Sequence, residues 1–166
     1  MTDYPESRSH ARQQTVSRGL LVFLRVYLGV VMLVAGWAKL SGEGSFTPRL
    51  VGFVENVGLE RGYGFFQGFL QSVVLPHAGF FAGLVSWGEL LAGLALITGT
   101  ATRLTSAAVV LMLLSYLLTK GATPWQASSN DAPMMFIALV LMLGAAGRML
   151  GVDQYLARKW PKVPLW

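Results

Sequence analysis

The sequence predicts an all-α integral membrane protein: a four-transmembrane-helix bundle with an amphipathic, interfacial helical segment between the first and second spans. Three observations predict this fold class. Of the 166 residues, 54% are hydrophobic and only 13% are charged, whereas roughly 25% are charged in a soluble domain. The apolar residues gather in four runs close to the ~20 residues that a helix needs to cross a bilayer. The basic residues stand mainly at the ends of those runs, as is typical of membrane proteins.

The boundaries follow from these runs. A polar basic leader is predicted over residues 1–18, and a basic amphipathic tail over residues 151–166. The transmembrane domain between them, residues 19–150, contains the predicted spans 19–40, 77–99, 104–118 and 132–150. Because this domain takes up 132 of the 166 residues, we expect any redox or hydrolytic domain to belong to another chain.

The first run follows a basic leader, which is the arrangement of a secretory signal peptide. It is longer than the apolar region of such a peptide and it contains Arg25, so we expect a retained first span. On this helix Arg25, Gly29, Gly36 and Lys39 share one face. Cations facing lipid are costly, so this face is predicted to turn into the bundle.

The long connection between the first and second runs contains an apolar segment over residues 46–75. Thr47 and Pro48 are typical of a helix start, and a short amphipathic helix is predicted from there to Gly58. The following residues, 63–75, are rich in phenylalanine, too few to span a bilayer and too apolar for water. We expect this segment to lie at the outer interface or to be partly re-entrant. There it either covers the bundle or forms an entrance for a lipid-soluble ligand or a docking surface for a partner subunit.

The second run carries Glu89 near its middle. A carboxylate at mid-bilayer costs about 2.5 to 3.5 kcal/mol on insertion scales, so it is expected to face a partner, a cavity or a ligand. Arg25 and Glu89 lie about 10 Å and 15 Å from the same end of the bundle, a difference that an arginine side chain can bridge. The sequence therefore predicts an ion pair between them. Its role stays open between a buried pair that fixes helix register and a polar pocket that binds a quinone or lipid head group or carries protons.

Other charged residues fall at the two ends of the predicted bundle. At the outer end Lys39 and Asp131 are predicted to pair. His77 stands at the mouth of the second span, where it could protonate a quinone oxygen. A charge cluster is predicted at the cytoplasmic end, made of Arg103, Arg148 and Asp153.

Charge and composition also bear on orientation and cofactors. Eight basic residues on one side against four on the other predict N- and C-termini in the cytoplasm. The net charge of +5 is carried at span ends, so no nucleic-acid partner is expected. The chain has no cysteine and only two histidines, His10 and His77. This excludes disulfide relays, Fe–S ligation and a transmembrane bis-histidine haem site. We expect no metal and no covalently bound cofactor, while a bound quinone or lipid stays open.

Taken in order, several short motifs resemble the DoxX family of small four-helix bacterial membrane proteins, which is related to the small subunit of thiosulfate:quinone oxidoreductase. The motifs are R25-x-x-x-G29, G36-x-x-K39-L40, W87-G-E89-L-L-A-G93, T102-R103, N130-D131, G147-R148 and G151-x-D153. The resemblance implies a polar set within the bundle, namely Arg25, Lys39, Glu89, Arg103, Asp131, Arg148 and Asp153. The long aromatic segment over residues 63–75 departs from the family pattern.

The resemblance implies the bacterial cytoplasmic (inner) membrane, a quinone-linked neighbourhood and a partner. We expect an accessory or scaffolding membrane subunit of a larger membrane complex, related to redox chemistry or electron transport and without catalysis of its own. The alternative is a quinone-binding or quinone-reactive subunit of an oxidoreductase, which an open cavity beside Glu89 would favour. A small transporter is a distant third, because neither a charge-lined path nor inverted repeats are found in the sequence.

Overall fold

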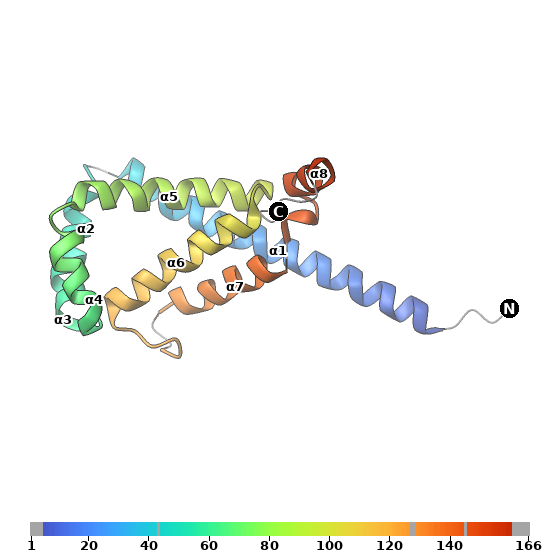
Figure 1. The fold of residues 1–166 in the computed structure, drawn as a ribbon, viewed down its shortest axis with the longest axis horizontal. Coiled ribbons are helices and arrows are strands. Elements are labelled where there is room, and N and C mark those ends of the chain that lie inside the picture. Colours follow the sequence, from blue (N-terminus) through green and yellow to red (C-terminus); the bar gives the residue numbers. More distant parts are fainter. Residues whose placement is uncertain (1–4, 43, 127–128, 145, 161–166) are drawn as a thin grey trace.

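The computed structural model is helical, without strands, over the residues that it describes, which are 5–160 apart from 43, 127, 128 and 145, with side chains from residue 18 onward (Figure 1). Three helices are long and apolar enough to cross a membrane. They are α1 (Pro5–Ser41), with its apolar part at Arg18–Ser41, α5 (Ala78–Thr98) and α6 (Thr102–Lys120). Their bounds agree with the first three predicted spans to within a few residues. The helix α1 begins inside the predicted leader.

The fourth apolar helix is shorter than predicted. Helix α7 (Asp131–Leu143) has 13 residues, about 20 Å of helix, whereas the predicted span covered residues 132–150. The chain continues into a short 3-10 turn, η3 (Ala146–Arg148). There a Cβ atom added at Gly147 would overlap the side chains of Asp153 and Thr102. The described residues therefore contain three helices of crossing length and one shorter apolar helix, and a count of four spans is not confirmed.

Helices α1 and α5 pack antiparallel through a seam of glycines. A Cβ atom added to Gly36 would overlap the backbone of Leu90, and one added to Gly93 would overlap the backbone of Leu33. In lipid, helices gain no hydrophobic free energy by associating, and small residues let two backbones approach closely enough for van der Waals contact. The seam therefore holds this helix pair together and sets its register.

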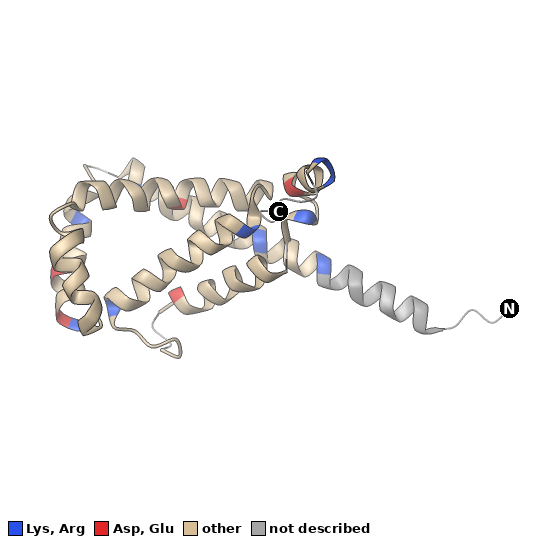
Figure 2. Ribbon diagram, in the orientation of Figure 1, with Lys and Arg blue, Asp and Glu red and all other residues tan. Residues whose placement is uncertain are grey.

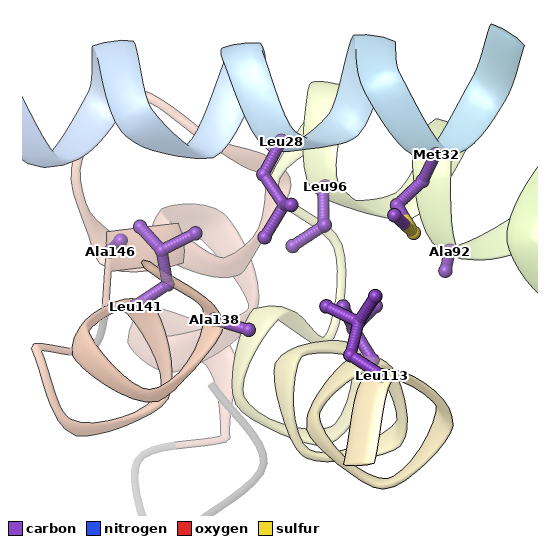
Figure 3. Packing of buried hydrophobic residues seen from close by; sticks show 9 residues of the cluster. Leu28, Met32, Ala92, Leu96, Leu113, Ala138, Leu141 and Ala146 are labelled. Atoms are coloured by element: carbon purple, nitrogen blue, oxygen red, sulfur yellow. The ribbon is translucent and has the colours of Figure 1, made fainter. Parts of the chain in front are cut away.

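The largest apolar core lies where α1, α5, α6, α7 and η3 meet (Figure 3). Its buried residues are Leu28, Met32, Ala92, Leu96, Val109, Leu113, Ala138, Leu141 and Ala146. On α5 and α7 an alanine lies about one turn from a leucine, Ala92 with Leu96 and Ala138 with Leu141, and the small side chains let the larger ones of the neighbouring helices pack at close backbone separation. This cluster joins the helices near the turn that links α5 to α6.

Residues 47–74, here called the connecting segment, are helical apart from a turn at Gly62 and Tyr63. The elements are α2 (Thr47–Phe53), the π-helix η1 (Val54–Gly58), α3 (Leu59–Arg61), α4 (Gly64–Phe69) and the π-helix η2 (Leu70–Val74). The predicted helix from Thr47 is present. It does not end at Gly58, because the chain stays helical to Arg61 and turns only at Gly62, whose backbone is extended.

The connecting segment is fixed to the far end of α6. The backbone N–H of Tyr63 donates to the carbonyl oxygen of Leu118 over 3.1 Å. A small apolar cluster of Val54, Leu70 and Val74 closes the segment on itself. Helix α5 ends and helix α6 begins at the turn of residues 99–101, and the two helices diverge with distance from it (Figure 1). The connecting segment lies across their far ends and contacts both.

Charged residues gather near the two ends of this arrangement and in the connecting segment, while the lengths of α5, α6 and α7 are almost free of them (Figure 2). Helix α8 (Val152–Lys159) runs across the bundle axis at the turn end, where Figure 1 shows it nearly end-on. It forms the first half of the predicted basic tail, and residues 161–166 lie outside the described part of the chain.

Candidate functional site

A cavity of about 770 Å³ lies between α5 and α6, beneath the connecting segment. Ligand pockets in proteins measure roughly 300–1,000 Å³ and are mostly apolar, with a few polar groups that orient the ligand. Of the 24 residues that line this cavity, 17 are apolar or glycine. Five of these are phenylalanines, namely Phe46, Phe53, Phe66, Phe69 and Phe81. The cavity has the size and the lining of a site for an apolar, ring-containing ligand.

Both π-helical stretches of the connecting segment contribute to the cavity. Val54 begins η1, and Leu70 and Val74 bound η2; all three are buried and line the cavity. A π-helical turn inserts one residue into an α-helix and so turns the following side chains to a new direction, and such turns are frequent at functional sites. The segment therefore presents apolar side chains to the cavity from both of its arms.

Glu89 stands behind the wall of the cavity with both of its carboxylate oxygens bonded. It is 2% exposed. The ammonium of Lys39 forms an ion pair with Oε2, and the hydroxyl of Tyr116 donates to Oε1 over 2.8 Å. Lys39 and Tyr116 themselves line the cavity. Glu89 thus holds two polar side chains, from α1 and from α6, at the surface that a ligand would meet.

The donor and acceptor roles at this wall follow from the chemistry of the three groups. An ionised carboxylate only accepts hydrogen bonds, so the proton of the Tyr116 hydroxyl is directed to Glu89. The lone pairs of the Tyr116 oxygen stay available to accept another bond. Lys39 has three N–H donors, and only one is used by Glu89. The wall therefore offers a ligand both a hydrogen-bond donor and an acceptor.

A second ion pair stands further along the same cavity. The ammonium of Lys120 lies 2.6 Å from Oδ2 of Asp131, and the hydroxyl of Ser129 donates to the same oxygen over 3.0 Å. Both members of the ion pair line the cavity. The predicted pair of Lys39 with Asp131 is therefore wrong. Lys120 ends α6, the helix against which α7 packs, so it is the nearer cation to the first residue of α7.

The predicted ion pair of Arg25 with Glu89 is also wrong, because the glycine seam sets a different register. Gly29 faces Gly93 across the seam, and Arg25, one turn before Gly29, therefore lies level with Gly99. Gly99 is ten residues beyond Glu89, about 15 Å along the helix. A cation at that level contacts the end of α5 and not its middle.

Arg25 is 1% exposed and binds backbone carbonyls. Its guanidinium donates to the oxygens of Ala146 over 2.9 Å, Met149 over 3.2 Å and Leu150 over 2.9 Å. These carbonyls follow the end of α7, where no further helical turn supplies donors. Arg25 therefore supplies donors to the carbonyl oxygens of this chain reversal, in addition to the N–H of Met149, which donates to the oxygen of Ala146.

Asp153 stabilises another chain reversal, the turn between α5 and α6. It is fully buried, and its carboxylate accepts hydrogen bonds from the backbone N–H of Ala101 over 2.6 Å and of Thr102 over 2.8 Å. These are the first donors of α6, where a carboxylate is favoured by the helix dipole. Ala101 and Leu150 are the two non-glycine residues of the described chain with positive φ. Each of these strained residues is thus bonded to a buried charged side chain.

The fold brings residues of the short sequence motifs together in two places. Arg25, Thr102, Gly147, Gly151 and Asp153 meet at the turn end, and Lys39 meets Glu89 beside the cavity. The family model for DoxX matches residues 20–122. The chain belongs to the DoxX family. No curated protein and no solved structure shows a significant match to it.

The remaining candidate residues of this DoxX protein lie outside the cavity. His77 precedes α5, is exposed, and its Nδ1 lies 3.0 Å from the carbonyl oxygen of Val73; it is not among the lining residues. Arg103 is half-buried in the first turn of α6, and Arg148 is exposed in η3. Within the described residues no three His, Cys, Asp or Glu side chains are grouped as metal ligands would be.

Sequence reasoning missed Tyr116 and Lys120, which complete the two polar contacts of the cavity. A signal for Tyr116 exists: it is the one aromatic residue in the apolar run of α6, and a buried tyrosine hydroxyl usually needs a partner. The signal for Lys120 is weaker, because a basic residue at the end of a span is ordinary. Neither residue could be paired with its partner without the helix register.

The cavity of this DoxX protein reaches the outer surface between α5 and α6. Leu84 and Leu111 both line it, yet they are 55% and 67% exposed. They stand on facing helices, so the space between them is a side opening in the apolar surface of the bundle. A lipid-soluble molecule could pass there from a bilayer without crossing the charged ends.

Proposed function

We propose that this DoxX protein binds a quinone in the cavity between α5 and α6, as the membrane subunit of an oxidoreductase whose redox groups belong to another chain. The observation that carries the proposal is the apolar, phenylalanine-rich cavity with Lys39 and Tyr116 at its wall. A cavity beside Glu89 is the feature expected of a quinone-binding subunit and not required of a pure scaffold. The quinone-binding alternative is therefore preferred here to the accessory role.

The chemistry of the wall suits a quinone. A quinone carbonyl accepts a hydrogen bond, which Lys39 can donate, and the hydroxyl of the reduced form can donate to the oxygen of Tyr116. The ring and its isoprenoid tail are apolar and would lie among the phenylalanines, which favour offset or edge-to-face contact with another ring. The side opening at Leu84 and Leu111 would admit the tail directly from the bilayer.

A partner chain is part of this proposal. The sequence contains no cysteine and so supplies no thiolate ligand for an iron–sulfur cluster. Electrons would have to reach a bound quinone from a group on another subunit. That subunit would have to place its redox group near the cavity, which lies toward the connecting segment and away from the turn end.

A second candidate function is the accessory or scaffolding role, in which the bundle docks a larger assembly and has no turnover of its own. Helix α8 favours it. Val152, Tyr155 and Trp160 are exposed there beside Arg158 and Lys159. Such an amphipathic, basic surface suits either the lipid head groups or an acidic partner.

Purification distinguishes the two roles. The protein is extracted from its native membranes in a mild detergent, the co-purifying proteins are identified by mass spectrometry, and the bound lipids are extracted and quantified. The quinone-binding proposal expects quinone in near-stoichiometric amount, with a redox subunit. Stable partners without quinone would instead support the scaffolding role and refute quinone binding.

A further inference from the structure

We infer that Glu89 makes the cavity selective for a neutral head group over an anionic one, by cancelling the charge of Lys39. The inference rests on the proposed function, since it assigns the chemical class of ligand to the same cavity. Glu89 does not line the cavity, so it acts as a positioning residue through Lys39 and Tyr116. Its effect is a choice between ligand classes, which a purely structural ion pair would not produce.

The balance of charges at the wall supports this inference. The two lysines of the lining are each matched by one carboxylate, Lys39 by Glu89 and Lys120 by Asp131. Glu89 is 2% exposed, so water screens its charge only weakly and its effect on Lys39 is strong. The remaining cation of the lining, Arg49, is exposed, and solvent screens it. The buried part of the wall therefore carries polar groups without net charge.

An anionic lipid would meet this wall unfavourably. Its carboxylate or phosphate would need a cation that is not already neutralised, and burying an uncompensated charge in an apolar cavity is costly. A quinone needs only hydrogen bonds. Lys39 can donate one while it stays paired, because its ammonium carries three donors. The wall thus favours a ligand with carbonyl or hydroxyl oxygens and no charge.

Substitutions of Lys39 and of Glu89 should change the affinity for anionic ligands in opposite directions. Glu89→Gln keeps the shape of the side chain and still accepts the hydrogen bond from Tyr116. It leaves the charge of Lys39 uncancelled, so the affinity for anionic ligands should rise. Lys39→Met leaves Glu89 as a buried anion without its cation, so the affinity for anionic ligands should fall below that of the native protein. The double variant Lys39→Met/Glu89→Gln removes both charges and should restore the preference for a neutral ligand.

The test uses the full chain in nanodiscs of uncharged phospholipid. Two labelled probes of similar length are compared, a decyl-substituted benzoquinone and a saturated fatty-acid anion, and retention on empty nanodiscs is subtracted. Glu60→Gln is the matched control, because it makes the same change of charge at an exposed site outside the cavity. The ratio of fatty-acid to quinone affinity is the readout.

We expect this ratio to rise by about tenfold in Glu89→Gln, the effect of one charge-assisted contact. It should fall in Lys39→Met, return toward the native value in the double variant and stay at the native value in the control Glu60→Gln. Quinone binding by the native protein with an unchanged ratio in Glu89→Gln and Lys39→Met would overturn the inference and leave the proposed function intact. If Glu89→Gln does not fold, the ratio in Lys39→Met alone decides. Native protein that retains no quinone above empty nanodiscs would refute the proposed function itself.

Discussion

Arg25 and Leu150 are 125 residues apart in the sequence, and the guanidinium of Arg25 donates a 2.9 Å hydrogen bond to the carbonyl oxygen of Leu150. The same side chain binds the carbonyls of Ala146 and Met149. One side chain on the first span thereby holds the chain reversal that follows the last apolar helix. The bundle is closed at this end by a charge bound to backbone oxygens, where the sequence had indicated a pair of opposite charges.

Replacing Arg25 with methionine should destabilise the bundle by about 3–5 kcal/mol, the cost of breaking a buried charged contact on one side. Three carbonyl oxygens would lose the guanidinium as a donor, and Asp153 nearby would lose the cation that acts on it. The midpoint of unfolding in a titration of detergent-solubilised protein with SDS measures the effect. Arg18→Met is the control, because Arg18 is exposed on the same helix; equal midpoints for the two variants would refute this role of Arg25.

Gly93→Ala should separate the first two spans. An added methyl group would overlap the backbone of Leu33, so α1 and α5 must move apart, at a cost of about 1–3 kcal/mol for overpacking. The same SDS titration measures it. Gly83→Ala, on the same helix, has nothing within 4 Å of the added atom and should gain up to about 1 kcal/mol from helix propensity. A stable Gly93→Ala protein would show that the seam is not close-packed.

Asp153→Ala should destabilise the turn between α5 and α6. The N–H groups of Ala101 and Thr102 would be left without their acceptor, which costs about 1–3 kcal/mol for a buried donor. Hydrogen exchange at these two amides, followed by mass spectrometry, should become faster. The neighbouring variant Gln154→Ala changes an exposed side chain and should leave the exchange rates as they are. Unchanged protection in Asp153→Ala would exclude the capping role.

Tyr116→Phe should weaken quinone binding about five- to tenfold, the effect of losing one hydrogen bond. The variant keeps the ring and removes the oxygen that accepts from the ligand and donates to Glu89. Binding of the benzoquinone probe in nanodiscs measures the change. Tyr27→Phe removes the same atom from a side chain that is 47% exposed on α1, and its affinity should equal that of the native protein. Equal affinities in all three proteins would remove Tyr116 from the site.

Apolar periodicity was sufficient to predict much of the fold. The runs that became α1, α5 and α6 are bounded by Gly99, Gly121 and basic residues, which are local signals that survive in any tertiary context. The fourth span was overestimated because composition stays apolar to Leu150, while the backbone turns at Gly147 to meet Asp153. The local pattern of residues 132–150 gives no indication of the contact between Gly147 and Asp153.

The pairing of charges could not be predicted because it depends on helix register. Counting residues from the ends of the spans placed Arg25 and Glu89 within reach of each other, but the contact of Gly29 with Gly93 sets them about 15 Å apart along the helices. Glu89 was correctly singled out as a buried carboxylate in need of a partner, since its cost in lipid is a property of the residue itself. The cavity could not be predicted from the sequence, because its walls come from elements far apart in the chain.

Filling the cavity tests the central claim most directly. Gly88 lines the cavity, and a Cβ atom added there has nothing within 4 Å, so the side chain of Gly88→Leu begins in open space at the cavity wall. Gly83→Leu makes the same change five residues earlier on the same helix and outside the lining. We predict that quinone extracted from the purified protein falls to near zero in Gly88→Leu and stays near-stoichiometric in Gly83→Leu. Full retention of quinone in Gly88→Leu would contradict binding in this cavity.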